Sequence, residues 1–99
     1  MLLYIANWPV SRVAAWDKLL QARAIENQSY VIGLNRVGED VNNIFFPGHS
    51  AVYDALGETL LFLGDEEKVE VVTLNKQALI ENRERLPFLK DRDEFTLSN

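Results

Sequence analysis

Hydrophobic positions along the chain switch between strand-like runs and helix-like spacing. Residues 2–6 form a short apolar run that ends before Pro9, which predicts a strand covered on both faces. Pro9 fixes a turn, Ser11 is a suitable N-cap, and the following pattern predicts a helix over residues 12–27. Apolar residues at three- and four-residue steps mark the inward face of this helix: Val13, Trp16, Leu20 and Ala24.

The rest of the chain predicts further strands and one more helix. Residues 30–34 read as a second buried strand, and strand, helix and strand together form a βα unit of the kind that builds parallel pairs. Residues 37–49 are rich in Gly, Asn and Pro and read as a loop. Short turns then separate three strands, which suggests antiparallel hairpins, at residues 50–54, 58–63 and 68–74.

A last helix is predicted from Asn75, its N-cap, to about Leu86, where Pro87 stops it. The predicted fold class is therefore α/β of the mixed α+β kind, with a βα unit followed by antiparallel strands and a final helix. A chain of 99 residues provides one domain with a modest core.

The amino-acid composition of the chain disfavours several classes of binding partner. The net charge of −5 and the absence of a basic stripe disfavour nucleic acid and anionic membrane surfaces. The opening apolar run is far shorter than the roughly 20 residues that span a bilayer. The chain has no cysteine, which removes disulfides, thiolate metal sites and a cysteine nucleophile, and which fits a cytoplasmic protein.

Individual polar residues give weak signals for catalysis. His49 is the only histidine and reads as a loop hydrogen-bonder, because no nucleophile or co-ligand accompanies it in the sequence. Ser50 lacks the glycine spacing of a nucleophile elbow. The acidic residues 65–67 lie in a predicted hairpin turn without the spacing of a calcium loop.

Arg23 and Glu26 are more informative, since a spacing of three residues lets them pair on one helix face. A solvent-facing pair contributes only tenths of a kcal/mol. A buried pair would need both partners, and losing one would cost roughly 3–5 kcal/mol. The sequence leaves both alternatives open and indicates a structural role first, with support of an active site second.

Asn7 and Asn35 each follow a strand of the predicted βα unit. Parallel neighbours would bring both carboxamides to the same carboxyl edge, where α/β sheets bind ligands. The alternative is that each amide satisfies backbone groups of its own turn. Both readings stay open at the level of spacing and residue type.

Four ordered motifs resemble the nitrilase, or carbon–nitrogen hydrolase, superfamily, and within it the omega-amidase branch. They are ANWP, ARAIENQ, NRVG and PGHSAVYDALGE, at residues 6–9, 22–28, 35–38 and 47–58. The resemblance is strong from Leu3 to about Glu58 and looser toward the end of the chain. It implies an αββα sandwich that dimerises and needs neither a metal nor an organic cofactor.

The resemblance also implies a chemistry. Members of this family hydrolyse amides with a Glu–Lys–Cys triad, in which a thiolate attacks the amide carbon, ammonia leaves, and activated water releases the acyl group. The omega-amidase branch acts on small-molecule substrates, the terminal amides of keto acids such as 2-oxoglutaramate. Matched to the family's motifs, the substrate-pocket residues are Asn7, Trp8, Pro9 and Asn35, with Arg23 and Glu26 as active-site support.

No residue of the chain matches the triad, so catalytic residues are expected to be absent from it. We therefore expect residues 1–99 to be the carboxyl-terminal portion of a carbon–nitrogen hydrolase domain, inactive alone, which forms a homo-oligomer or associates with a missing amino-terminal part. The alternative is a non-enzymatic interaction module, or a complementing subunit, that associates through an exposed apolar edge.

Overall fold

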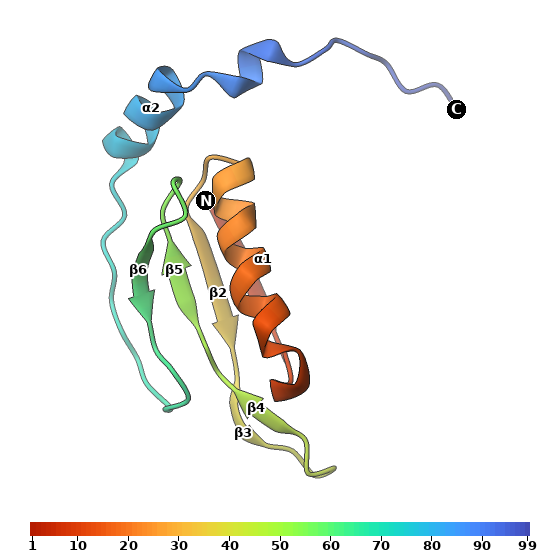
Figure 1. The fold of residues 1–99 in the computed structure, drawn as a ribbon, viewed down its shortest axis with the longest axis vertical. Coiled ribbons are helices and arrows are strands. Elements are labelled where there is room, and N and C mark those ends of the chain that lie inside the picture. Colours follow the sequence, from red (N-terminus) through yellow and green to blue (C-terminus); the bar gives the residue numbers. More distant parts are fainter.

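A parallel βα unit forms the first part of the fold, as the sequence predicts. The computed structural model describes residues 1–99. Strand β1 (Leu2–Ala6) leads through a short turn into helix α1 (Val13–Glu26), and β2 (Val31–Asn35) returns beside β1. The two strands pair in parallel register, so Ala6 lies next to Asn35 and both strands end at the same edge (Figure 1).

Two further strands complete a four-stranded sheet of mixed direction. Strand β5 (Ala51–Tyr53) pairs antiparallel with β2, and β6 (Thr59–Phe62) pairs antiparallel with β5. The order across the sheet is β1-β2-β5-β6, and α1 lies across one face of it (Figure 1). The core gathers between α1 and this face, and its buried cluster consists of Trp16, Leu20, Ala24, Val31, Ala51 and Tyr53.

The prediction that the first strand is covered on both faces is wrong. Leu2, Tyr4 and Ala6 pack against the core, but Leu3 is 55% exposed and Ile5 is 73% exposed. The reason is positional: β1 is an edge strand, α1 covers only one face of the sheet, and alternate residues of a strand point to opposite faces.

Two other expectations about strands are also wrong. The predicted loop over residues 37–49 contains an antiparallel two-stranded sheet, formed by β3 (Val37–Glu39) and β4 (Phe45–Pro47). Conversely, residues 68–74 form no strand. Their alternating pattern suits a strand, but they pair with no neighbour, and Val69 and Val71 are almost fully exposed.

The start of α1 also differs from the prediction, because Ser11 does not act as an N-cap. A 3-10 turn over Val10–Arg12 joins the helix directly, and the Arg12 N–H donates to the Pro9 carbonyl at 3.1 Å. The α-helix therefore begins at Val13 without a side-chain cap.

The second helix, α2 (Lys76–Arg85), begins at the predicted cap: Asn75 Oδ1 accepts from the Ala78 N–H at 3.0 Å. Arg83 fastens the helix to the loop before β2, since its Nε donates to the Gln28 carbonyl and its Nη2 to Ser29 Oγ. A short 3-10 turn (Phe88–Asp91) and an extended arm follow, leading away from the sheet (Figure 1).

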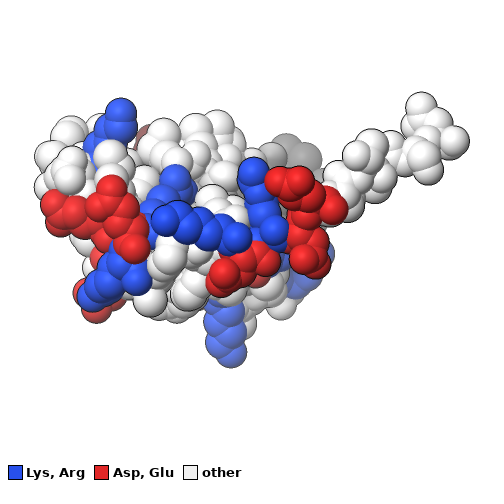
Figure 2. All heavy atoms as spheres, turned by 90° about the horizontal axis from the view of Figure 1, so that it is seen from above, with Lys and Arg blue, Asp and Glu red and all other residues white.

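Figure 2 shows the molecule from above, with acidic and basic side chains next to one another and no region in which one sign of charge dominates. Neither α-helix has both the length and the apolar character needed to cross a membrane.

Candidate functional site

The carboxyl edge of the parallel pair β1–β2 is organised by one side chain. Asn35 is 7% exposed, and its Oδ1 accepts from the Trp8 N–H at 2.7 Å. Its Nδ2 donates to the carbonyls of Trp8 and Gly48, both at 2.9 Å. This amide therefore joins the loop after β1 to the segment between β4 and β5, and holds both at the end of β2.

Ser50, the residue before β5, holds the backbone of Asn35. Its hydroxyl accepts from the Asn35 N–H at 2.9 Å and donates to the Asn35 carbonyl at 3.1 Å. Since this buried hydroxyl is already engaged on both sides, Ser50 is a structural group here rather than a nucleophile.

Gly48 lets the chain pass closely beside the turn after β6. Its φ is +73°, and a Cβ at this position would lie 2.5 Å from the Gly64 carbonyl oxygen. Only glycine combines this left-handed conformation with so close an approach. The neighbouring His49 N–H donates to the same Gly64 carbonyl at 2.8 Å, so two segments far apart in sequence close one side of the site.

The predicted pocket residues of the loop after β1 lie at this edge and differ in burial and in hydrogen bonding. Trp8 is half-buried, its ring centroid is 5.7 Å from that of Trp16, and its Nε1 donates to the Arg12 carbonyl. Pro9 is also half-buried. Asn7 is exposed and makes no hydrogen bond through its side chain, so its amide is free to bind a ligand. Asn35 instead satisfies backbone groups.

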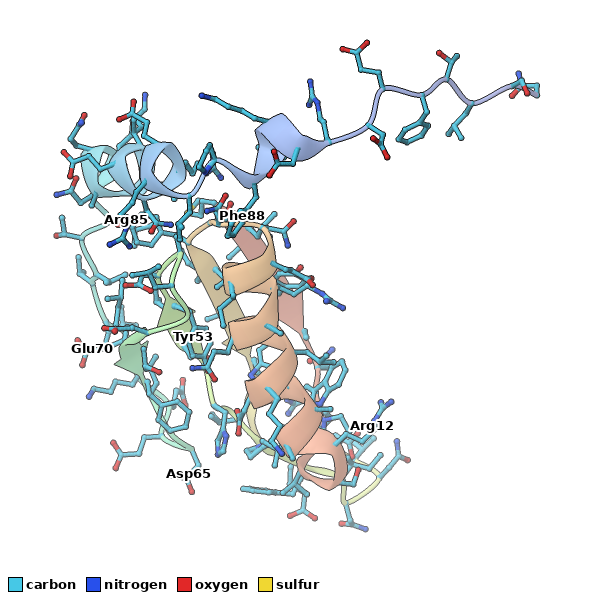
Figure 3. All side chains as sticks on the ribbon, turned by 45° about the horizontal axis from the view of Figure 1, so that its top comes forward. Arg12, Tyr53, Asp65, Glu70, Arg85 and Phe88 are labelled. Atoms are coloured by element: carbon cyan, nitrogen blue, oxygen red, sulfur yellow. The ribbon has the colours of Figure 1, made fainter.

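Arg23 and Glu26 form the predicted ion pair at 2.5 Å, with side chains that are 43% and 53% exposed. The solvent-facing alternative therefore holds, and the buried alternative is wrong. The pair lies near the carboxyl end of α1, whereas Arg12 marks the other end, beside the Trp8 loop (Figure 3). Its role as active-site support stays a prediction.

A polar cluster that the sequence did not reveal lies on the helix side of the site. His49 Nδ1 is 3.0 Å from both carboxylate oxygens of Asp17, and Trp16 Nε1 donates to the His49 carbonyl at 2.9 Å. Burial raises the pKa of Tyr53, and the negative charge of Asp17 raises it further. Thirty-two positions separate Asp17 from His49, and no spacing rule connects them.

The groups at this edge are suited to binding a ligand. The edge offers a free amide, a half-buried tryptophan and fixed backbone groups, but no cysteine, and its serine is engaged. His, Asp and Glu side chains nowhere gather in a group of three that could hold a metal ion.

The sequence profile of carbon–nitrogen hydrolases matches residues 2–84. The chain belongs to the carbon–nitrogen hydrolase family. It is 45% identical over 96 residues to an omega-amidase of Yersinia enterocolitica, covering 96% of this chain and 38% of that protein. It is 42% identical over 87 residues to a 2-oxoglutaramate amidase of Paenarthrobacter nicotinovorans, covering 88% of this chain and 29% of that one.

A solved carbon–nitrogen hydrolase has the same fold over the matched part. The protein XC1258 of Xanthomonas campestris, described with an arsenic adduct in its active site, superposes with a TM-score of 0.89 at 43% identity. The superposition covers 99% of this chain and 38% of XC1258. This carbon–nitrogen hydrolase chain therefore spans less than two fifths of the length of these relatives, and its mixed α/β layer corresponds to part of the nitrilase fold.

Proposed function

We propose that this chain forms one wall of the substrate pocket of an omega-amidase-like carbon–nitrogen hydrolase. The observation that carries the proposal is the buried Asn35 amide, which fixes the Trp8 loop and Gly48 at the carboxyl edge of two parallel strands. Ligands of α/β sheets bind at such edges. Asn7, Trp8 and Pro9 stand on this wall, and Asn35 positions them.

The substrate we propose is the terminal amide of a keto acid such as 2-oxoglutaramate. Relatives at 45% and 42% identity carry the names omega-amidase and 2-oxoglutaramate amidase, which supports this choice. In such a reaction water replaces the amide nitrogen, so that the amide becomes a carboxylate and ammonia is released. No metal or organic cofactor takes part in the proposal.

We infer that the chain does not hydrolyse amides by itself. Family chemistry requires a thiolate, and this chain contains no cysteine. The catalytic Glu, Lys and Cys would then come from another stretch of protein, with residues 1–99 as the carboxyl-terminal portion of the assembled domain. The assembly would reside in the cytoplasm, in keeping with a chain without disulfides.

Complementation tests this function. The chain is produced alone and together with the part of the Yersinia enterocolitica omega-amidase that it does not cover, and ammonia release from 2-oxoglutaramate and succinamate is measured. We expect turnover only from the assembled pair, abolished by alkylation of its thiol. Turnover by the chain alone that resists alkylation would reject the proposal, as would an assembled pair without activity.

A second candidate function is supported by the exposed edge strand β1. Leu3 and Ile5 are exposed on the uncovered face of this edge strand, and exposed apolar edge strands recruit other chains. In this case the chain would be a non-enzymatic interaction module or homo-oligomer. Size-exclusion chromatography with light scattering decides: a monomer at all concentrations contradicts this candidate, and a stable oligomer that shows no complementation favours it.

A further inference from the structure

A cavity of about 360 Å³ opens at the end of β2, next to the pocket wall. Leu34 and Ser50 contribute to its lining, together with the turn after β6. Leu34 alternates with Gly33, which lies against Leu20 of α1, so the cavity is on the sheet face that α1 leaves uncovered. Four charged side chains line it: Arg36, Glu66, Glu67 and Lys68.

Of the two cations in this cavity, only Arg36 lacks a carboxylate partner. Lys68 Nζ lies 2.8 Å from Glu70, and this hydrogen bond raises the pKa of the lysine. The ion pairs of the chain are Arg23–Glu26, His49–Asp17 and Lys68–Glu70, and none involves Arg36. The one hydrogen bond of the Arg36 guanidinium is long, 3.4 Å from Nη2 to the Glu39 carbonyl.

The guanidinium of Arg36 is nevertheless held in place. Its central carbon lies 4.6 Å from the ring centroid of Phe46, a buried residue of β4. An arginine over an aromatic face keeps its N–H edges directed sideways, available for a planar anion. Hydrogen bonds between the Asn35 backbone and the Ser50 hydroxyl fix the strand end next to Arg36.

We propose that Arg36 binds the carboxylate of the substrate and makes the site selective for ligands with one carboxylate and one terminal amide. This inference rests on the proposed function and adds a charge-recognition subsite that shares Asn35 with the proposed pocket wall. A guanidinium binds a carboxylate through two parallel N–H···O bonds, which fixes its orientation. Glu66 and Glu67, on the same cavity, would repel a second carboxylate.

This arrangement distinguishes substrate from product. An ω-amide of a dicarboxylic acid carries one negative charge, and its hydrolysis product carries two. The amide end meets Glu66 and Glu67 without repulsion, whereas the new carboxylate of the product does not. We therefore expect the site to bind the amide more tightly than the dicarboxylate, which favours product release.

The test is an NMR titration of the complete, ¹⁵N-labelled chain with succinamate, succinamide and succinate, which carry one, no and two carboxylates. We expect succinamate to shift the Arg36 Nε–H signal and to bind about tenfold more tightly than the other two, equivalent to about 1.4 kcal/mol. Arg36→Gln should remove this preference, and Arg36→Lys should retain only part of it, because lysine lacks the planar fork.

Arg12→Gln is the matched control, since Arg12 also lies over an aromatic ring, at 5.1 Å from that of Trp8, but does not line the cavity. It should keep the preference for succinamate. The inference is overturned if succinamate does not bind, if all three ligands bind equally, or if Arg36→Gln behaves like Arg12→Gln. Dispersed spectra of each variant establish that it is folded.

Failure of this inference and failure of the proposed function give different results. If the assembled hydrolase acts on succinamate and Arg36→Gln slows charged and neutral amides equally, the function stands and the role of Arg36 is rejected. If the assembly is inactive while the chain alone binds succinamate through Arg36, the carboxylate site stands and the proposed function is rejected.

Discussion

At the scale of single residues, Asn35 shows why a carboxamide is required at the end of β2. Its oxygen accepts from one backbone N–H, and its nitrogen donates to two backbone carbonyls, so all three groups are satisfied in a buried place. A carboxylate has the same shape but no donor. The identity of this residue therefore follows from the hydrogen-bonding groups of the loops around it.

We expect Asn35→Asp to lower the free energy of unfolding by about 2–4 kcal/mol, because it leaves two carbonyls unpaired and places a negative charge beside them. Urea unfolding measures the change. Asn7→Asp is the matched control directly after the neighbouring strand β1, and since Asn7 is exposed it should change stability by less than about 0.5 kcal/mol. Equal effects at the two positions would contradict the assigned role of Asn35.

The raised pKa of Tyr53 predicts that the stability of the chain depends on pH. Burial raises its pKa above the ordinary value of 10.0, and Asp17 adds to the shift. Because the folded pKa exceeds the unfolded one, the stabilisation is fully present below about pH 10 and is lost as the pH rises through the folded pKa. The free energy of unfolding, measured from neutral to alkaline pH, should therefore decrease as the pH rises above about 10.

Two variants separate the causes of this dependence. Tyr53→Phe removes the titrating phenol and should flatten the alkaline fall, whereas Asp17→Asn should reduce it only in part, because burial is the larger cause. A Tyr53→Phe variant with an unchanged alkaline slope would refute the assignment to this residue.

The sequence predicted the placement of residues that follow local patterns, but it did not predict contacts between residues far apart along the chain. The strand ends near Asn7 and Asn35 followed from local patterns, and the predicted parallel pairing of the two strands is confirmed, with Ala6 beside Asn35. The direction of each amide did not follow, because it depends on backbone groups of Trp8 and Gly48 that only the folded chain brings near. The contact between Asp17 and His49 had no local signal at all.

At the scale of elements, the packing of α1 on β2 depends on the absence of a side chain at Gly33. A Cβ there would overlap the Leu20 side chain and lie 3.0 Å from Trp16 Cζ2. The helix therefore approaches the sheet more closely over this strand than any larger residue would allow.

Gly33→Ala should destabilise the chain by about 1–3 kcal/mol through overpacking, and Leu20→Ala by about 2–5 kcal/mol through the cavity it leaves. The double variant should cost less than the sum of the two, because each change relieves the other. Urea unfolding of the three variants measures this coupling. Strict additivity would show that Gly33 and Leu20 do not share the packing described.

Helices and strands were predictable where their hydrophobic pattern corresponds to a sheet face or a neighbouring strand that packs or pairs with them in the fold. The apolar steps of α1 met a sheet face, and the parallel return to β2 followed. Residues 68–74 have a strand pattern, yet they form no strand, although the neighbouring β6 is an edge strand of the sheet. The β3–β4 pair was missed for the opposite reason: Gly and Asn suggested a loop, while backbone pairing alone forms the hairpin.

At the scale of the whole molecule, one face of the four-stranded sheet is covered by a helix and the opposite face is not. Helix α1 covers the face that carries Tyr4 and Gly33, whereas Leu3 and Ile5 remain exposed on the opposite face. A partial αββα sandwich has this asymmetry, since its second sheet would lie against the uncovered face. The proposed assembly with the remainder of a carbon–nitrogen hydrolase would accordingly bury these side chains.

This assembly predicts a specific effect of charge on the uncovered face. In Ile5→Lys an ammonium replaces a side chain that is 73% exposed in the chain alone, so the stability of the chain itself should change by less than about 0.5 kcal/mol. Burying that ammonium without a partner would be unfavourable, and the loss of isoleucine burial adds about 1.5–3 kcal/mol. Co-purification with the remainder of the hydrolase should therefore fall at least tenfold.

Val41→Lys is the control, because Val41 is almost fully exposed and lies between β3 and β4, a pair that extends beyond the end of the four-stranded sheet (Figure 1). It introduces the same charge and should leave co-purification unchanged. If Ile5→Lys assembles as well as Val41→Lys, the uncovered face is not where the remainder of the hydrolase binds. A defect in both variants would attribute the loss to added charge in general, and the sheet face would have no special role.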